Sequence, residues 1–480
     1  MEATEVLVIG AGPTGLLLAG DLAEAGVSVA LLERRPTDAA NLTRAFAVHA
    51  RTLEQLDARG VADELLDHGV RVDAFELFGR VRLGLAGLAS RFPFVLVTPQ
   101  YQTEAVLMRR AEAAGVRIER GTEVVALRQD ADGVEVDVRD GWGELTTKRA
   151  AYLVGTDGAH STIRRLLGEP FPGRSVVQSL MLADVQLTSP PSSGLTVRSG
   201  AAGFLLIAPF GDGWYRVFAW DRANQQPDSA PVSLAEVRDL VRNVAGTDFG
   251  MREARWTSRF HSDERQVAHY RVGRVFLAGD AAHVHSPAGG QGMNTGLQDA
   301  ANLGWRLAGA IRGWAGAEVL DGYQAERHRV GRMVLRGSNV LLRAALQRGA
   351  VPTLIRASVA TVVARIRPLT RLAAGALTGI GVRYPAPAGA HRRVGTRVPD
   401  LALTGAGPGR LYEALRGGRF VLVSPPEPTK GDTAEVARET AARAGWRGPV
   451  TMVTSAQPLG TALLVRPDGY LAWANGLPGR

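Results

Sequence analysis

Glycines close to the N-terminus have the spacing that a phosphate-binding turn requires. The run Gly10-Ala11-Gly12-Pro13-Thr14-Gly15 follows an apolar stretch, and Glu33 closes the next apolar stretch. In this pattern the glycines allow a tight turn, close approach of the backbone to a pyrophosphate, and packing of helix on strand. The N–H groups at the start of the following helix stabilise phosphate charge, and an acid at the position of Glu33 accepts hydrogen bonds from an adenosine ribose. The motif predicts a bound dinucleotide and leaves open whether it is NAD or FAD.

Two later segments also place polar residues directly after an apolar run. Thr156-Asp157-Gly158 follows residues 152–155, and Gly279-Asp280 follows residues 275–278 and leads to a glycine-rich stretch over 287–294. A helix starting near Gly292 would aim its free N–H groups at the negative charge that a reduced flavin carries, which favours a redox flavin. His283 and His285 invite a metal site, but no third ligand is evident nearby, so we expect no metal.

The elements that must position these motifs follow from periodicity. Residues 5–9 and 27–32 are expected to be strands flanking a helix that stops near Gly26, which is a βαβ unit and indicates the α/β class. Residues 180–187, 204–208 and 214–220 predict an inserted, mainly antiparallel sheet. A strand over 274–278 precedes the helix at 292, and residues 330–380 are helical with breaks at Pro352 and Pro368. The expected domains are a discontinuous dinucleotide-binding domain (1–174 with 271–330), an inserted sheet domain (175–270), a helical connector (331–385) and a C-terminal domain (386–480).

Composition narrows the class of protein. The chain has 480 residues, 45% of them hydrophobic and 21% charged, which indicates a globular protein of several domains. The net charge of +9 is spread over scattered arginines without a nucleic-acid-binding motif, so we expect no nucleic acid partner. There is no cysteine, which excludes disulfides and thiolate metal sites, so redox work needs a bound cofactor. The acidic start and the lack of a long apolar run predict a cytoplasmic protein with no membrane span.

Taken together, the three motifs resemble the signatures of the group A flavoprotein monooxygenases, the family of p-hydroxybenzoate hydroxylase. The resemblance covers roughly residues 4–345. The stretch Leu464-Val465-Arg466-Pro467-Asp468-Gly469 is similar to the thioredoxin-like third domain of the bacterial hydroxylases that act on polyketides and related antibiotics. Without cysteine this domain cannot work as a thioredoxin. The resemblance implies an α/β protein with a Rossmann-type FAD-binding domain, an inserted antiparallel-sheet substrate domain and a C-terminal thioredoxin-like domain.

The resemblance also assigns site residues. Arg44, in Thr43-Arg44-Ala45, looks like the family arginine that contacts FAD, and Arg44 and Pro287 are the implied catalytic positions. Asp157 lies in the motif implicated in both FAD and reduced-nicotinamide recognition. The implied cofactor contacts are Gly10, Gly12, Thr14 and Gly15 on the pyrophosphate, Glu33 and Arg34 on the ribose, Arg44, Gln100 on the flavin side chain, Val124 on the adenine side, Asp157, Asp280 on the ribityl or pyrophosphate region, and Gly290, Gly292, Met293 and Asn294 at the flavin end.

The activity implied by the resemblance is hydroxylation of a polycyclic aromatic, polyketide-derived substrate. NADPH or NADH binds transiently, which fits the lack of a second clear dinucleotide motif, and O₂ gives a flavin C4a-hydroperoxide. Baeyer–Villiger oxygenation or inactivation of an antibiotic would use the same motifs. A flavin oxidase or dehydrogenase without oxygen transfer would also bind FAD through them, and so would a non-catalytic flavoprotein. The oligomeric state is left as monomer or homodimer.

Aromatic residues on the inserted sheet are the candidates for substrate contact. Phe204 and Phe218 lie on predicted strands, where alternate side chains would face the flavin and form a wall for an aromatic substrate. Such a face can equally be plain core. Arg216 on the same strand as Phe218 is predicted to orient a phenolate, with an exposed strand arginine as the alternative.

Overall fold

The structure is a computed structural model that describes residues 4–36, 45–77, 81–192, 194–287, 289–346, 362–363, 365–426, 439, 441–442 and 445–474. The FAD-binding part is built on a six-stranded sheet of order β18-β19-β12-β1-β2-β8. Its strands are β18 (Arg271–Val272), β19 (Val275–Leu277), β12 (Tyr152–Gly155), β1 (Val6–Ile9), β2 (Val29–Glu33) and β8 (Arg117–Arg120). All neighbours pair in parallel except β18 with β19. The central strands β1 and β2 are buried throughout, which explains their continuous apolar sequence.

Helices cover this sheet and connect its strands. The helix α1 (Pro13–Glu24) follows β1 as predicted, and it packs on α4 (Gln100–Ala113) and α7 (Gln291–Ile311). Shorter helices are α2 (Ala50–Asp57), α3 (Ala62–Leu66), α5 (Thr162–Leu166), η1 (Gly279–Ala281) and η2 (Ala317–Leu320). Two small sheets complete this part, namely β9 (Glu123–Gln129), β10 (Val134–Arg139) and β11 (Leu145–Ala150), and β3 (Ala47–Val48), β7 (Val95–Val97) and β4 (Val70–Val72).

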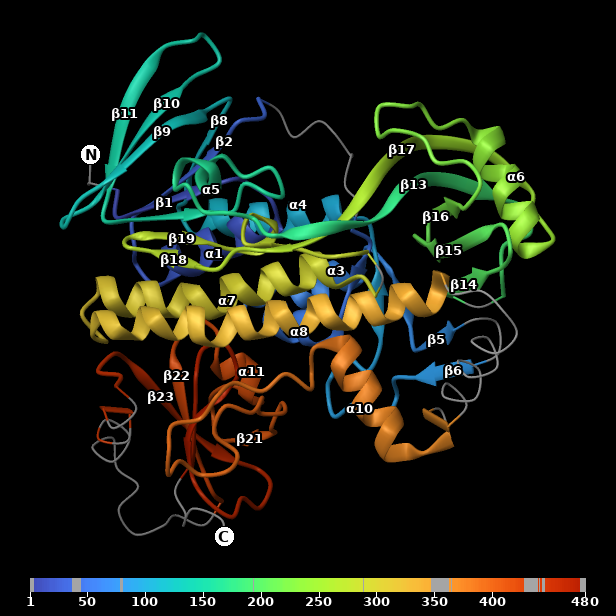
Figure 1. Cartoon of the computed structure of the whole chain (residues 1–480). Coiled ribbons are helices and arrows are strands. Elements are labelled where there is room, and N and C mark those ends of the chain that lie inside the picture. The colour runs from blue at the N-terminus through green and yellow to red at the C-terminus, as the bar shows by residue number, and fades with distance from the viewer. Residues whose placement is uncertain are drawn as a thin grey trace.

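The inserted sheet has eight strands and extends to one side of the molecule (Figure 1). In order they are β20 (His283–Val284), β17 (Met251–Gln266), β13 (Gly173–Leu187), β16 (Trp214–Asp221), β15 (Gly203–Pro209), β14 (Thr196–Ser199), β5 (Ala74–Leu77) and β6 (Val81–Gly84). The helix α6 (Leu234–Ala245) covers one face. The strands β5, β6 and β20 lie outside the predicted range 175–270, because the sheet also recruits edge strands from the FAD-binding part.

The C-terminal residues form a separate five-stranded sheet of order β21-β23-β22-β24-β25. Its strands are β21 (Leu403–Thr404), β23 (Val450–Ser455), β22 (Phe420–Ser424), β24 (Leu463–Val465) and β25 (Leu471–Ala474), with the short helix α11 (Leu411–Ala414). Figure 1 shows α7 and α8 (Asp321–Leu346) running side by side between this domain and the FAD-binding sheet. The helix α10 (Arg367–Thr378) has Pro368 in its first turn, where this residue type fits, whereas Pro352 lies outside the described residues.

The C-terminal domain is anchored to the rest by buried polar contacts. Arg466 donates to Glu326 of α8 at 2.7 Å, and Asn302 of α7 donates to the Asp468 carboxylate at 3.2 Å. Gln55 of α2 donates to the Asp468 carbonyl oxygen at 2.9 Å. The end of the segment that the sequence singled out, residues 466–469, therefore docks this domain on the rest of the chain and is called the docking loop below.

Candidate functional site

The glycine turn between β1 and α1 has the geometry that its sequence predicts. Gly10 adopts φ +105°, which favours glycine, and a Cβ on Gly15 would lie 2.0 Å from the Gly10 carbonyl oxygen. Gly12 is different, because a Cβ there would meet nothing within 4 Å. Gly10 and Gly15 are thus required by the protein's own packing, whereas Gly12 borders open space on the side where a pyrophosphate would approach.

Two helices begin here without a capping side chain. Gly12 is the N-cap of α1 and Gly290, with φ +63°, is the N-cap of α7. Neither N-cap makes a side-chain hydrogen bond, and neither first turn contains an acidic residue. The N–H groups at these starts are the partners that an anionic cofactor needs, so the residues present fit FAD.

Glu33 sits at the carboxyl end of β2 beside the turn. Its carboxylate accepts from the Ala11 N–H at 2.8 Å and from the Arg35 N–H at 2.9 Å. Burial raises the pKa of Glu33, but the hydrogen bonds from Arg35 and Ala11 outweigh burial and hold the pKa below its usual value. The Thr122 N–H donates to the Glu33 carbonyl oxygen, which brings the start of β9 with Val124 to this end of the site. Arg34 is exposed.

The two predicted aspartates occupy different surroundings. Asp157 accepts hydrogen bonds from the Thr162 N–H at 2.6 Å and the Ile163 N–H at 3.1 Å, so it holds the start of α5. Its Cα would be 2.9 Å from a Cβ on Gly10, which places it against the turn. Asp280 is exposed, and its Oδ1 would lie 3.9 Å from a Cβ on Gly292. The Asp280 motif therefore meets the start of α7.

Ala45 is the point where the Gln100 and Arg216 positions meet. The Ala45 N–H donates to Gln100 Oε1 at 3.3 Å, and the Ala45 carbonyl accepts from the Gln100 N–H at 3.2 Å. The same carbonyl accepts from Arg216 Nη1 at 3.3 Å. Arg216 is fully buried, so the alternative of an exposed strand arginine is wrong. Its predicted contact with a substrate oxygen stays a prediction, and Arg44 lies outside the described residues.

Asn294 joins the start of α7 to the chain before α2. Its Oδ1 accepts from the His49 N–H at 2.8 Å, and its Nδ2 donates to the Ala47 carbonyl at 2.8 Å and the Gly290 carbonyl at 2.7 Å. Asn294 is buried, whereas the neighbouring Met293 is partly buried. The asparagine therefore fixes the backbone at the predicted flavin end.

Several residues of the site escaped the sequence reasoning. Thr14 Oγ1 lies where a Cβ on Gly279 or Gly296 would come within 2.8 Å or 2.4 Å, so Gly296 lets α1 approach α7 and Gly279 lets α1 approach η1. Asp299 of α7 accepts from the Gly279 N–H and from Arg327 Nε, at 3.1 and 2.6 Å. Gly296 and Asp299 follow Gly292 in the same predicted helix, and this small residue and this acid are the signals from which the two contacts could have been predicted.

The two histidines after Asp280 are packed rather than arranged around a metal. His283 Nε2 lies 2.6 Å from Asp299, and the His283 ring stacks on His285 with centroids 5.4 Å apart. Burial, with a smaller effect of His283, lowers the pKa of His285 to about 3, so this ring is neutral at physiological pH. Over the described part of the chain, no group of three or more potential metal ligands comes together.

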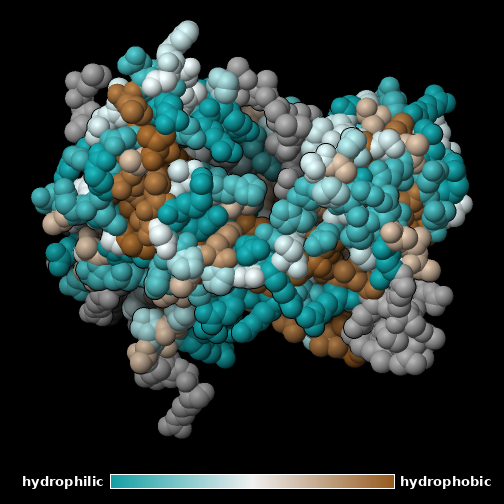
Figure 2. Space-filling view, turned by 45° about the horizontal axis from the view of Figure 1, so that its top comes forward, coloured by the Kyte–Doolittle hydropathy of each residue, from teal (hydrophilic) through white to brown (hydrophobic). Residues whose placement is uncertain are grey.

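The predicted substrate wall lies on the sheet face that looks toward α8 and α10. Phe218 is buried and packs on Phe46 with ring centroids 5.2 Å apart, and Phe204 is partly buried beside Trp220. Both phenylalanines belong to one apolar cluster with Leu342 of α8. Figure 2 shows the surface recessed between the FAD-binding part and this sheet. Pro287, in the loop before α7, is partly exposed, and its carbonyl accepts from the Gly290 N–H.

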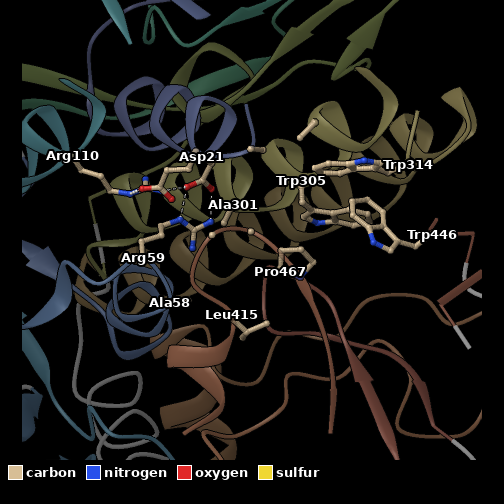
Figure 3. Close-up of a pocket in the computed structure, with 15 residues that line it drawn as sticks. Asp21, Ala58, Arg59, Arg110, Ala301, Trp305, Trp314, Leu415, Trp446 and Pro467 are labelled. Atoms are coloured by element: carbon tan, nitrogen blue, oxygen red, sulfur yellow. Dashed lines mark hydrogen bonds and ion pairs between the residues drawn. The ribbon is translucent and has the colours of Figure 1, made fainter. Parts of the chain in front are cut away.

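A separate small pocket lies at the junction with the C-terminal domain (Figure 3). Trp305, Trp314 and Trp446 line one side, and Asp21 lies on the other side between Arg59 and Arg110. Both arginines already pair with Asp21, so these charged groups of the pocket are engaged with one another within the FAD-binding part.

Comparisons with known proteins agree with this geometry. Residues 3–338 match the FAD binding domain family, and residues 391–479 match the aromatic-ring hydroxylase C-terminal family. The rifampicin monooxygenase of Streptomyces venezuelae is 39% identical, with 98% of this chain and 95% of that protein covered. The 12-dehydrotetracycline 5-monooxygenase/anhydrotetracycline 6-monooxygenase of Streptomyces rimosus is also 39% identical, with the same coverage. The solved structure of CabE, an aromatic hydroxylase from angucycline biosynthesis, has a TM-score of 0.86 at 35% identity and covers 100% of this chain and 97% of its own.

The uncapped starts of α1 and α7, the glycine turn that leaves open space at Gly12, and the two family matches lead to one assignment. The chain belongs to the FAD-binding aromatic-ring hydroxylase family and is a flavoprotein monooxygenase.

Proposed function

We propose that this chain hydroxylates a polycyclic aromatic, polyketide-derived substrate with NADPH or NADH and O₂. The observation that carries the proposal is the apolar cluster that contains Phe46, Phe204 and Phe218. Phe46 is next to Ala47, whose carbonyl accepts a hydrogen bond from Asn294 near the start of α7. An extended apolar wall of this kind suits a flat, multi-ring compound better than a single small ring. The substrates named for the rifampicin, tetracycline and angucycline relatives support this choice of class.

The chain's own groups divide the work as follows. Gly12 and the start of α1 would hold the pyrophosphate, Glu33 would hold the ribose, and Val124 would lie on the adenine side. Asp280 and the N–H groups after Gly290 would hold the flavin end. Gln100 and Pro287 would line its other sides, with Arg44 as the arginine that the resemblance implies there, and Asp157 keeps the start of α5 against the glycine turn. Bound FAD supplies hydride acceptance and oxygen activation.

The surroundings of the flavin end are apolar on the side of the inserted sheet. Phe218 and Phe46 are buried and apolar, so they would keep water away from the space beside the flavin end. The N–H groups at the start of α7 would stabilise negative charge on a flavin bound there. His285 is neutral at physiological pH and adds no positive charge there.

Product analysis is the test. The purified protein with FAD is mixed with NADPH or NADH and a panel of polycyclic phenols, and NAD(P)H oxidation, peroxide and product mass are measured. Coupled NAD(P)H use with a product that is heavier by one oxygen and carries a new ring hydroxyl group supports the proposal. Ring expansion of a ketone substrate by one oxygen would replace hydroxylation with Baeyer–Villiger chemistry. Peroxide equal to the NAD(P)H consumed, with every panel member recovered unchanged, would contradict oxygen transfer.

The setting of the enzyme is proposed on less direct grounds. Among the residues placed in the structure, no helix has both the length and the apolarity to cross a bilayer. We propose that the enzyme works in the cytoplasm as a monomer or homodimer, with O₂ as co-substrate. Sedimentation of the holoenzyme would decide between the two oligomeric states.

A further inference from the structure

Arg216 is held in the middle of the inserted sheet by an ion pair and by aromatic rings. Its Nε donates to Asp184 Oδ1 at 2.8 Å and its Nη2 donates to Asp184 Oδ2 at 2.9 Å. The guanidinium lies over the rings of Phe210 and Trp256, 5.2 and 5.1 Å from their centroids. Arg216 is 0% exposed and Asp184 is 1% exposed. The two strands β13 and β16 therefore fix this guanidinium in one orientation.

The remaining nitrogen of the guanidinium, Nη1, makes a contact outside the inserted sheet. Arg216 Nη1 donates to the Ala45 carbonyl oxygen at 3.3 Å, across 171 positions of the sequence. On its other side Ala45 exchanges two hydrogen bonds with Gln100, one through the Gln100 side chain and one through its backbone N–H. Gln100 Nε2 is itself held by Glu104 Oε1 at 2.7 Å. Ala45 is thus clamped between α4 of the FAD-binding part and β16 of the substrate sheet.

This clamp sits at the entry to the flavin end. Ala45 follows Arg44 directly and leads into Ala47, whose carbonyl accepts from Asn294 at the start of α7. A buried ion pair costs desolvation that an apolar pair of similar volume does not, so stability alone does not explain Arg216 and Asp184. The pairing also cancels the charge of the guanidinium, which makes it a weak partner for an anionic substrate.

We propose that Arg216 is a positioning residue that Asp184 orients and that holds the Ala45 carbonyl, so that it sets the segment 45–48, which lies between the implied FAD contacts Arg44 and Asn294, against the substrate sheet. The inference rests on the proposed function and assigns Arg216 a task other than direct contact with substrate. Asp184, whose buried carboxylate pairs with Arg216, then matters for the cofactor as much as Arg216 does.

Two variants and a matched control test this assignment in the full-length holoenzyme. Arg216→Lys keeps the charge beside Asp184 but loses the planar fork, and Asp184→Asn removes the orienting charge. Arg259→Lys is the control, because Arg259 is also buried in this sheet and pairs with Glu236 at 2.8 Å, while its hydrogen bonds within the described part of the chain go to Ser179, Glu236 and the segment 230–231. The readouts are the FAD dissociation constant, the visible spectrum of bound flavin, substrate KM and kcat, and the thermal midpoint.

We expect Arg216→Lys and Asp184→Asn each to raise the FAD dissociation constant by about tenfold and to alter the flavin spectrum, because each loosens a charge-assisted hydrogen bond to the clamp. Substrate KM should change less, and Arg259→Lys should leave FAD affinity as in wild type. Arg216→Lys combined with Asp184→Asn should be non-additive for FAD affinity, because both changes act through the same ion pair.

Other outcomes overturn the inference. A raised substrate KM in Arg216→Lys with unchanged FAD affinity, and a wild-type-like Asp184→Asn, would make Arg216 a substrate contact. An equal rise of the FAD dissociation constant in Arg259→Lys would mean that FAD affinity responds to any buried ion pair of this sheet. If Arg216→Lys does not fold, an unchanged FAD dissociation constant in Asp184→Asn contradicts the clamp. Wild-type protein that binds no FAD at all would instead contradict the proposed function.

Discussion

Replacing Glu326 by glutamine should loosen the C-terminal domain. Glu326 accepts from Arg466 Nη1 at 2.7 Å and Nη2 at 2.9 Å, from Arg306 Nη2 at 2.9 Å and from Asn302 Nδ2 at 2.7 Å. Burial raises the pKa of Glu326, but Arg466 and Arg306 outweigh burial and bring the pKa from 4.5 to about 2. This carboxylate is the acceptor that joins α7, α8 and the docking loop.

Its contribution can be worked out in two ways. A carboxyl whose pKa falls from 4.5 in the unfolded chain to about 2 in the fold contributes about 3 kcal/mol of stability at pH 7. Removing one partner of a buried ion pair costs about 3–5 kcal/mol, because the other charge stays buried without its counterion. Since the folded pKa is depressed, the contribution of Glu326 is complete above its unfolded pKa and is lost as pH falls from 4.5 toward 2.

Urea unfolding of wild type and Glu326→Gln, followed by tryptophan emission, measures this difference. Trp305 is a local reporter because Arg466 lies 5.1 Å from its ring centroid. We expect a loss of about 3 kcal/mol at pH 7 that shrinks to about 1 kcal/mol at pH 3. Asp321→Asn, which removes the exposed partner of Arg271, should cost less than about 1 kcal/mol. Equal midpoints for wild type and Glu326→Gln, or a difference that does not shrink at pH 3, would refute this reasoning.

Three further changes separate binding from packing. Gly12→Val should fold like wild type, because a Cβ there meets nothing within 4 Å, yet lose most bound FAD; wild-type flavin absorbance in the purified variant would contradict the pyrophosphate assignment. Gly15→Ala should instead lower the thermal midpoint, because its Cβ would lie 2.0 Å from the Gly10 carbonyl oxygen, and an unchanged midpoint would contradict that geometry. His285→Leu should reduce acid sensitivity, since a pKa of about 3 in the fold against 6.5 in the unfolded chain makes wild type lose about 2 kcal/mol between pH 7 and pH 5; thermal midpoints at both pH values measure this, and parallel losses in both proteins would contradict it.

The sequence predicts the local elements of the site well and their meeting points poorly. The turn before α1 and the start of α7 are confirmed, because glycine spacing and a change from strand to helix periodicity are local signals. The antiparallel insert is confirmed as well, yet β5, β6 and β20 join it from other parts of the chain. Pairing of such edge strands depends on the tertiary arrangement and leaves no mark in a short sequence window.

Long-range polar contacts explain why the sequence alone did not exclude an exposed position for Arg216. An arginine on a strand is usually solvated, and nothing near residue 216 in the sequence announces the partner Asp184 on β13 or the carbonyl of Ala45. The same holds for Asp299 of α7, which contacts His283 of β20 and Arg327 of α8. Buried ion pairs form only when the fold brings their members together, so a single sequence shows the residue types without the pairing.

The helix α2 gives the cysteine-free C-terminal domain a connection to the flavin end. Its N-terminus follows His49, whose N–H is held by Asn294 at the start of α7. Further along the same helix, Arg51 and Gln55 both donate to the Asp468 carbonyl of the docking loop. The short helix α2 therefore contacts the docking loop and, at its N-terminus, follows the segment held by Asn294. This connection between the C-terminal domain and the site is made by hydrogen bonds and needs no cysteine.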